Sequence, residues 1–599
     1  MAGQSIRRSQ YITTYGPGAI LEGPNGPRII PSLANSTLFD RRPAHDFEIT
    51  DLRLSTALLN GANIVRVPSN AELGQSDTEE VYNTFPFPSW ALCTKHNILY
   101  LKSPDAHDRR SCPQCAPHQT DMAAWQRVRQ QAIRFIMACP QGHLDDVDWN
   151  RVVQHRTPGC RSTFFHWAGG GSALRNITIT CPNCNASVNL GSAYAKKWPC
   201  SGRHPEHSRD RHGCDAEAQI LQRGAANLHM AEIYSALTIP PSDTRLHRLL
   251  ESPAIQQMLL DVHIESKQDF LDRLQRRVPR YIGQATVDEI ARYNEEEILA
   301  AIQQTLQADL PSDSQQLRNQ EFIALRRAAE HGAPAQPSST PGAPPQFEVI
   351  KNDVRIFDGK YGHSFRVTPV SRLRVVMVQH GYRRLDPVQS EIVSVEYIDN
   401  HNRVWYPGVE LFGEGIFIDL DPASLIDGFH FPLSHSVSNS EWHQAWFDPE
   451  RYQQRLYEPT DKDYLHPVFV WWHTLSHRLI NALSIDSGYS SAAVRERVYI
   501  DVDSETGKAV GGILLYTAQP GGDGTLGGMI ALVPHFNRVL QSALHRIDAC
   551  SNDPLCSDEY FRQGKYNGAA CYACQLVSET SCEHRNTRLD RHLLLENLP

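Results

Sequence analysis

Fourteen cysteines in a chain of 599 residues are the side chains whose spacing most clearly indicates chemistry. Six of them form three C-x-x-C pairs, Cys112–Cys115, Cys181–Cys184 and Cys571–Cys574. This spacing points two thiolates at one tetrahedral ion, and Zn²⁺ is the ion that sets of four Cys and His donors bind. The N-terminus has no secretory signal, so we expect a cytoplasmic protein with reduced thiols and structural zinc rather than disulfides.

The first predicted zinc site combines Cys93 and His96 with Cys112 and Cys115. Two knuckles about fifteen residues apart match the two arms of a zinc ribbon, in which each tight turn supplies two ligands. His96 is the uncertain ligand, because His107 or His118 could take its place. The second predicted site combines four cysteines, Cys181, Cys184, Cys200 and Cys214. Three histidines compete for the last ligand position: His204, His207 and His212.

A looser set consists of Cys139, His143, His155 and Cys160. It could form a third zinc site, or it could be a buried cysteine with histidines that hydrogen-bond to neighbouring aspartates. We favour the second interpretation.

The C-terminal block offers five thiols for four ligand positions: Cys550, Cys556, Cys571, Cys574 and Cys582. The last three are closely spaced, so we expect them to bind one ion, with Cys556 or Cys550 as the fourth ligand. Four sulfur ligands leave no position for water, which predicts a structural site. We expect two or three zinc ions in all, and at most four.

Motifs of a self-sufficient enzyme are missing from the sequence. Gly507-Lys508-Ala509 lacks the first glycine and the hydroxyl of a phosphate-binding loop, and the glycine-rich stretch at 521–528 is most simply a turn. His473 and His477 stand one helical turn apart, but a packed helix face is favoured over a metal pair, because no third ligand is near in the sequence. We therefore expect no catalytic residues and no cofactor besides zinc.

Charge is distributed unevenly along the chain. The net charge is −9, yet residues 86–250 contain 19 lysines and arginines against 12 aspartates and glutamates. Such a local excess could contact phosphates. The candidate DNA contacts are two basic pairs near zinc knuckles, Arg109–Arg110 and Lys196–Lys197, and the alternative is a solvated rim.

The sequence pattern predicts an α+β, multidomain fold. The sequence contains no run of about 18 apolar residues, the length that a membrane-spanning helix needs. We divide the chain into an N-terminal β-rich segment (1–85), a zinc-ribbon-like region (86–225), a helical region (226–330), a flexible linker (331–346), a β-rich domain (347–465) and a C-terminal α/β zinc-binding domain (466–599).

Several segments together resemble a known family. "HTLSHRLINALSIDSGYSSAAVRERVY", "GGILLYTAQPGGDGTLGGMIALV" and "NGAACYACQLVSETSCEHRNTRLDR" look like the DUF1998 domain, the zinc-binding domain of MrfA-type helicases. "RRSQYITTYGPGAIL", "FPFPSWALCTKH", "RFIMACPQGHLDDVDW" and "LQRGAANLHMAEIYSALTIPP" are similar to the long stand-alone form of that family, the DrmB-like component of the DISARM anti-phage defence system. The resemblance covers most of the chain except about 240–346.

The resemblance implies a non-catalytic partner of a superfamily 2 helicase (DrmA in DISARM), which forms a heterodimer and helps to bind DNA and to discriminate foreign from self DNA. In this chain His96 stands where the family would have a second cysteine. Two alternatives stay open. The chain could be an interaction scaffold that never touches DNA, which its acidic net charge favours, or a cryptic zinc hydrolase, which the missing motifs disfavour.

Overall fold

The computed structural model describes most of the chain: residues 5–23, 26–76, 79–102, 112–115, 130–170, 173–208, 210–239, 245–250, 252–262, 264–278, 281–307, 310–335, 346–358, 364–424, 440–454, 456, 459–519 and 528–599. Predictions for Arg109, Arg110, His107, His118 and the stretch 521–527 lie outside these residues, as does most of the predicted linker.

The chain divides into two compact units, each assembled from three stretches. Unit 1 consists of Met1–Ile49, Ala62–Tyr234 and Val378–Val409, and unit 2 of Thr50–Gly61, Ser235–Met377 and Glu410–Pro599. The finer six-segment division stays a prediction.

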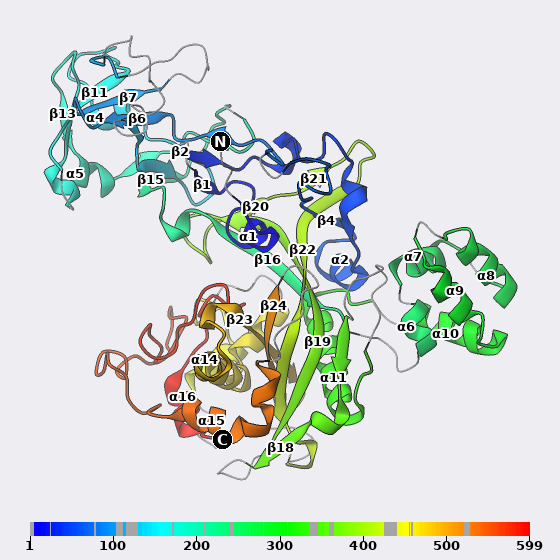
Figure 1. Ribbon diagram of the computed structural model, residues 1–599. Helices are drawn as coiled ribbons and strands as arrows, with labels where there is room; N and C mark the ends of the chain where they lie inside the picture. The colour runs from blue at the N-terminus through cyan, green and yellow to red at the C-terminus, as the bar shows by residue number, and fades with distance from the viewer. Residues whose placement is uncertain are drawn as a thin grey trace. The chain divides into compact units, whose positions relative to one another are not determined.

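Unit 1 contains small antiparallel sheets made of short strands (Figure 1). The first has the order β1 (Ile20–Gly23), β2 (Gly26–Ile29), β5 (Phe85–Pro86). The second has the order β10 (Leu144–Asp146), β9 (Phe135–Ala138), β15 (Glu217–Gln222), β14 (Lys197–Pro199). The third has the order β13 (Ser187–Asn189), β12 (Thr178–Thr180), β11 (Phe164–Ala168), β7 (Ile98–Leu101), β6 (Trp90–Cys93), β8 (Gln130–Ala132).

Further elements of unit 1 are short. They are α1 (Arg8–Thr13), α4 (Trp149–Val153), α5 (Leu190–Tyr194), β3 (Glu48–Ile49), β4 (Asn63–Arg66), β20 (Val393–Ser394) and β21 (Tyr397–Ile398). The second and third sheets share one apolar core with α4 and α5, which includes Trp90, Phe135, Trp149 and Trp198. Cys139 and Cys181 are fully buried in this core, so two of the candidate metal ligands belong to it.

Long strands supply the sheet of unit 2. In this unit the sheet order is β19 (Ser364–Arg383), β22 (Val404–Leu420), β24 (Ala509–Gln519), β23 (Val494–Val502), where residues 378–383 and 404–409 of the first two strands belong to unit 1. β17 (Phe347–Val349) and β18 (Arg355–Asp358) pair with β19. β16 (Met230–Leu237) spans the unit boundary at Tyr234.

Two helices cover opposite faces of this sheet. They are α14 (Pro467–Ser487) and α11 (Ser314–His331). A Cβ on Gly511 would lie 2.5 Å from Trp472 Cδ1 of α14, and one on the next residue, Gly512, 3.1 Å from Phe322 Cε2 of α11. Because successive residues of a strand face opposite sides, β24 lies between the two helices. The glycine pair lets both helices approach the strand closely.

The remaining helices of unit 2 form two groups. α6 (Arg245–Leu250), α7 (Pro253–Asp261), α8 (Lys267–Gln275), α9 (Gln284–Ile290) and α10 (Glu295–Gln307) share an apolar core of their own (Figure 1). The others are α2 (Leu52–Leu58), α13 (Glu441–Phe447), α15 (Phe536–Leu544) and α16 (Arg591–Glu596). The predicted α+β fold class is confirmed, and the helix expected at "FVWWHTLSHRLINALSI" is α14.

Alternation along β23 buries a charged residue on each face of the sheet. Glu496 points to the α14 side, like Val494 and Val498, which belong to the apolar core on that side. Arg497 points to the α11 side, where Glu321 binds it through two contacts, Nε–Oε2 2.6 Å and Nη2–Oε1 2.9 Å. Both residues are fully buried. Buried charges need partners, and Glu496 contacts His473 and His477.

Candidate metal centres

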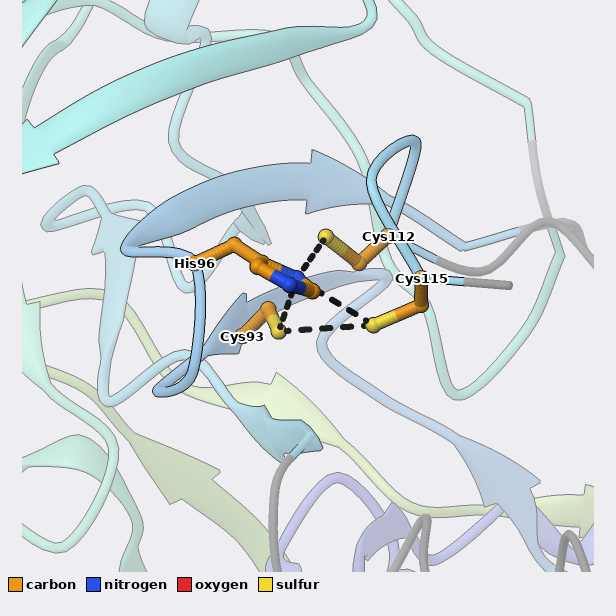
Figure 2. A group of neighbouring side chains, drawn as sticks. All are labelled: Cys93, His96, Cys112 and Cys115. Atoms are coloured by element: carbon orange, nitrogen blue, oxygen red, sulfur yellow. Dashed lines mark hydrogen bonds between the residues drawn. The ribbon is translucent and has the colours of Figure 1, made fainter.

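Cluster 1 consists of Cys93, His96, Cys112 and Cys115, the first predicted set (Figure 2). Cys93 ends β6, and the turn before β7 carries His96 and then Asn97 at φ 52°. Asparagine tolerates this left-handed conformation better than most residues. The second knuckle closes through a hydrogen bond from Cys115 N to Cys112 O of 2.9 Å.

The spacing of the four ligand atoms fits zinc. His96 Nδ1 lies 3.6, 3.5 and 3.4 Å from the sulfurs of Cys93, Cys112 and Cys115, and the Cys93 and Cys115 sulfurs are 3.8 Å apart. Zn–S bonds of about 2.3 Å and a Zn–N bond of about 2.0 Å at tetrahedral angles require separations of about 3.5–3.8 Å. A zinc ion can therefore bind here without rearrangement.

Cluster 2 consists of Cys139, His143, Cys200 and Cys214. The β9–β10 turn carries the first two, with Gly142 at φ 82° and a distance of 3.3 Å from Cys139 Sγ to His143 Nδ1. Cys200 follows β14, and Cys214 lies three residues before β15. Since β15 pairs with both β14 and β9, all four ligands meet at one end of the second sheet.

Cluster 3 consists of His155, Cys160, Cys181 and Cys184. The Cys181 and Cys184 knuckle connects β12 to β13, with Asn185 at φ 55°, the same turn conformation as at Asn97. His155 Nδ1 lies 3.2 Å from Cys184 Sγ, and the sulfurs of Cys160 and Cys181 are 3.9 Å apart.

The composition of clusters 2 and 3 corrects two predictions. Cys181 and Cys184 do not share a site with Cys200 and Cys214, and the looser set of Cys139, His143, His155 and Cys160 divides between the two clusters. The physical reason is strand pairing: β9, β14 and β15 belong to the second sheet, and β12 and β13 to the third. His204, one of the predicted competitors, instead contacts Glu206 at 2.9 Å.

Cluster 4 consists of Cys550, Cys556, Cys571 and Cys574. Sulfur–sulfur distances are 3.4 Å for Cys550–Cys571, 3.7 Å for Cys556–Cys574 and 3.7 Å for Cys571–Cys574. Both Cys550 and Cys556 therefore belong to the set, whereas the sequence predicted only one of them.

Cys582 is the thiol that the sequence placed wrongly, since it does not join Cys571 and Cys574. It lies in a fifth group with His473, His477 and Glu496, whose ligand atoms are within 4.8 Å of one another. Glu496 comes from β23 and Cys582 from the C-terminal loop, so no short spacing indicated either of them as a further ligand for the histidine pair.

In the absence of a metal ion, the thiols of cluster 3 have different pKa values. Burial alone raises the pKa of Cys184, but the backbone of Ala186 and the side chain of His155 lower it to about 6. Burial and the neighbouring sulfurs of Cys184 and Cys181 raise the pKa of Cys160 to about 11. A Zn²⁺ ion bound here would favour the thiolate forms, because metal binding displaces the thiol protons.

Comparisons with known proteins agree with this metal chemistry. Residues 475–575 match the MrfA Zn-binding domain, and residues 7–230 match a domain of unknown function, DUF8724. The chain is thus a zinc-binding protein with an MrfA-type domain, and its cofactor is structural zinc. All 14 cysteines are free thiols in the structure.

The similarity extends to one curated relative over most of the chain. The DISARM protein DrmB of Bacillus paralicheniformis (strain ATCC 9945a / NCIMB 11709 / CD-2) is 26% identical over 552 residues, 86% of this chain and 89% of the relative. The resemblance that the sequence indicates is thereby confirmed. The crystal structure of the DUF1998 helicase MrfA bound to DNA matches at 13% identity with a TM-score of 0.19, over 34% of this chain and 20% of that one, which is too low to carry an argument.

The predicted DNA contacts are only partly described by the structure. Lys196 and Lys197 lie at the end of α5 and the start of β14, and both are exposed. Arg156 and Arg161, which the sequence analysis did not single out, are also exposed, and each follows a member of cluster 3 directly.

Within the described part of the chain, no helix is long and apolar enough to span a membrane.

Proposed function

We propose that this chain is a non-catalytic, zinc-stabilised partner of a DrmA-like superfamily 2 helicase in prokaryotic anti-phage defence. It would act in the cytoplasm as one half of a heterodimer that binds and recognises foreign DNA. The observation that carries the proposal is the similarity to a DISARM protein DrmB over 86% of this chain, together with the MrfA Zn-binding domain.

The ligand assignment is part of the proposal. Clusters 1, 2 and 3 each bind one zinc ion through three cysteines and one histidine, and cluster 4 binds one through four cysteines. Each set supplies four protein ligands and leaves no coordination position for water or substrate. These sites therefore hold loops in place rather than perform hydrolysis.

The proposed role predicts that the chain alone does not hydrolyse ATP. Because the sequence contains no phosphate-binding loop, we expect no ATP hydrolysis by the purified chain and robust hydrolysis only when the helicase is present. The measurement is phosphate release by a preparation shown by mass spectrometry to be free of helicase. Turnover by such a preparation would contradict the non-catalytic assignment.

DNA contact is proposed for a basic surface beside clusters 2 and 3. It consists of Arg156, Arg161, Lys196 and Lys197, which are exposed and form no ion pair with the residues that the structure describes. Arg156 and Arg161 adjoin the zinc ligands His155 and Cys160, so the ion restrains the backbone that carries them. A restrained, unpaired cation loses little entropy on binding a phosphate.

The test is charge reversal in the helicase complex. We expect Arg156→Glu/Arg161→Glu and Lys196→Glu/Lys197→Glu to weaken DNA binding and to reduce its salt dependence by about 0.9 log units per decade of salt for each lost contact. The matched control is Lys351→Glu/Arg355→Glu, which reverses two exposed cations outside the basic region. Unchanged affinity and slope in both test variants would refute this surface and favour the scaffold alternative.

A further inference from the structure

We propose that His473, His477, Glu496 and Cys582 form a fifth zinc site, which is buried in unit 2 and separate from the four cysteine-rich clusters. The donors are two imidazole nitrogens, one carboxylate oxygen and one thiolate. They come from three parts of the chain, since α14 carries both histidines, β23 carries Glu496, and the C-terminal loop carries Cys582.

The ligand atoms converge on a small volume. Glu496 Oε1 lies 2.8 Å from His473 Nε2 and 3.2 Å from His477 Nε2, and Cys582 Sγ lies 3.2 Å from His473 Nε2. A tetrahedral zinc ion requires about 3.3 Å between nitrogen and oxygen and about 3.5 Å between nitrogen and sulfur. Each of these three separations is within about 0.5 Å of the value that zinc requires, and all four ligand atoms lie within 4.8 Å of one another.

The hydrogen bonds around the two histidines orient them as metal ligands. His477 Nδ1 lies 2.7 Å from the carbonyl oxygen of Gln575, and His473 Nδ1 lies 3.3 Å from that of Arg588. A carbonyl only accepts, so each Nδ1 carries the hydrogen and each neutral ring presents the lone pair of Nε2 to Glu496. Ligating histidines in metalloproteins are held by such backbone carbonyls.

The two other ligands are oriented as well. Ser476 donates its hydroxyl hydrogen to Glu496 Oε2, which leaves Oε1 for the ion. The backbone N–H of Asn586 donates to Cys582 Sγ at 3.3 Å. Two imidazole nitrogens, a carboxylate oxygen and a sulfur thus face one another, which is a donor set that Zn²⁺ binds.

Charge balance is compatible with zinc in this buried site. The histidines and Glu496 are 0% exposed and Cys582 is 5% exposed. Zn²⁺ with two neutral imidazoles, one carboxylate and one thiolate has no net charge, so the buried site needs no further counter-ion when the metal is bound. Burial of an uncompensated charge is costly, and mixed nitrogen and sulfur donors in a tetrahedral arrangement are typical of zinc.

The site would act as a structural connector. Four protein ligands fill the tetrahedron, and their burial excludes substrate. One ion would join α14, β23 and the C-terminal loop on the face of the sheet opposite to Glu321 and Arg497.

The experiment counts zinc ions in the intact full-length chain by native mass spectrometry. We expect five ions in the unmodified protein and four in both Cys582→Ser and Cys571→Ser. The double variant should hold three, because the two thiols belong to different sites. The matched control is His584→Gln, since the His584 ring lies 5.3 Å from the His473 ring without belonging to the set, and it should keep five ions.

Two results would overturn the proposal. One is a double variant that holds four ions, since Cys571 and Cys582 would then serve the same zinc. The other applies even if the variants fail to fold: an unmodified protein that holds only four zinc ions. The first result would also change the ligand set of cluster 4, whereas the second would leave clusters 1–4 untouched, and neither bears on the proposed role as a helicase partner.

Discussion

Asn150 shows at the scale of a single residue how a side chain that binds no metal can control a metal ligand. It lies in α4, whose N-cap Asp148 accepts a hydrogen bond from Arg151 N at 3.2 Å. Its Oδ1 lies 3.0 Å from His155 Nε2 and accepts from Ser162 N at 2.8 Å. This contact holds the hydrogen on Nε2 and leaves Nδ1 as the lone pair that faces Cys184.

We therefore predict that Asn150→Ala weakens zinc binding at cluster 3 by about 10–100-fold, the usual cost of losing such an orienting contact. Asn150→Asp keeps an acceptor at this position and should retain most of the affinity. Competition with a chromogenic chelator measures the zinc affinity of each site in the full chain, and one site should bind zinc more weakly in the alanine variant. Equal affinities for the alanine variant and the unmodified chain would show that Asn150 does not orient His155.

Single ligands were predictable where the turn that carries them is short. Cys93 and His96 and all three C-x-x-C pairs lie in the described clusters, because the spacing alone sets their geometry. His143 was harder, since Cys139-Pro-Gln-Gly-His143 is one residue longer than a C-x-x-C knuckle. A glycine before the histidine, shortly after the apolar strand β9, is the signal that could have identified it.

At the scale of elements, strand order decides which knuckles share an ion, and the sequence does not reveal strand order. Cys200 and Cys214 meet Cys139 because β15 pairs with both β14 and β9. Cys181 and Cys184 meet His155 and Cys160 at the other sheet. Such pairings join residues far apart in the chain, so local patterns predicted the donors but assigned their partners wrongly.

The contact between α11 and β23 permits a prediction at this scale. Arg497 is bound by Glu321 and also by Glu583 at 3.0 Å. Glu321→Ala should cost on the order of 3–5 kcal/mol, because it leaves a buried arginine without its closest partner. Adding Arg497→Met should recover part of that loss, because the double variant removes both charges.

Hydrogen exchange of the α11 backbone amides measures this effect locally, which avoids treating a chain of two units as a two-state system. The matched control is Glu330→Ala on the same helix, whose side chain is 45% exposed and contacts Arg366 at 3.2 Å. A half-exposed pair should contribute less than about 1 kcal/mol. Equal protection in the Glu321 and Glu330 variants would contradict the central role of the Glu321–Arg497 pair.

At the scale of the whole molecule, zinc and apolar packing stabilise different regions. The strands of the second and third sheets are short, three to six residues each, and cluster ligands lie within or against their shared core. The sheet of unit 2 has longer strands, among them β24 with 11 residues and β23 with nine, and its face toward α14 contains a large core of tryptophan, leucine and valine side chains. The first region therefore depends on its ions more than the second does.

We accordingly predict an ordered response to zinc removal. After chelation at neutral pH, protease should cut first within residues 86–225 and 545–590, and only later between α14 and β24. The loss of metal releases the knuckles, whose binding energy is part of their folding energy, whereas the apolar core around α14 persists even if a fifth ion leaves. Peptide mapping of a digestion time course, with metal analysis of each sample, gives the order of cleavage. The control is chelator saturated with zinc, which should leave the digestion pattern unchanged. If the segment from α14 to β24 were cut first in zinc-free protein, apolar packing would not be what holds unit 2 together.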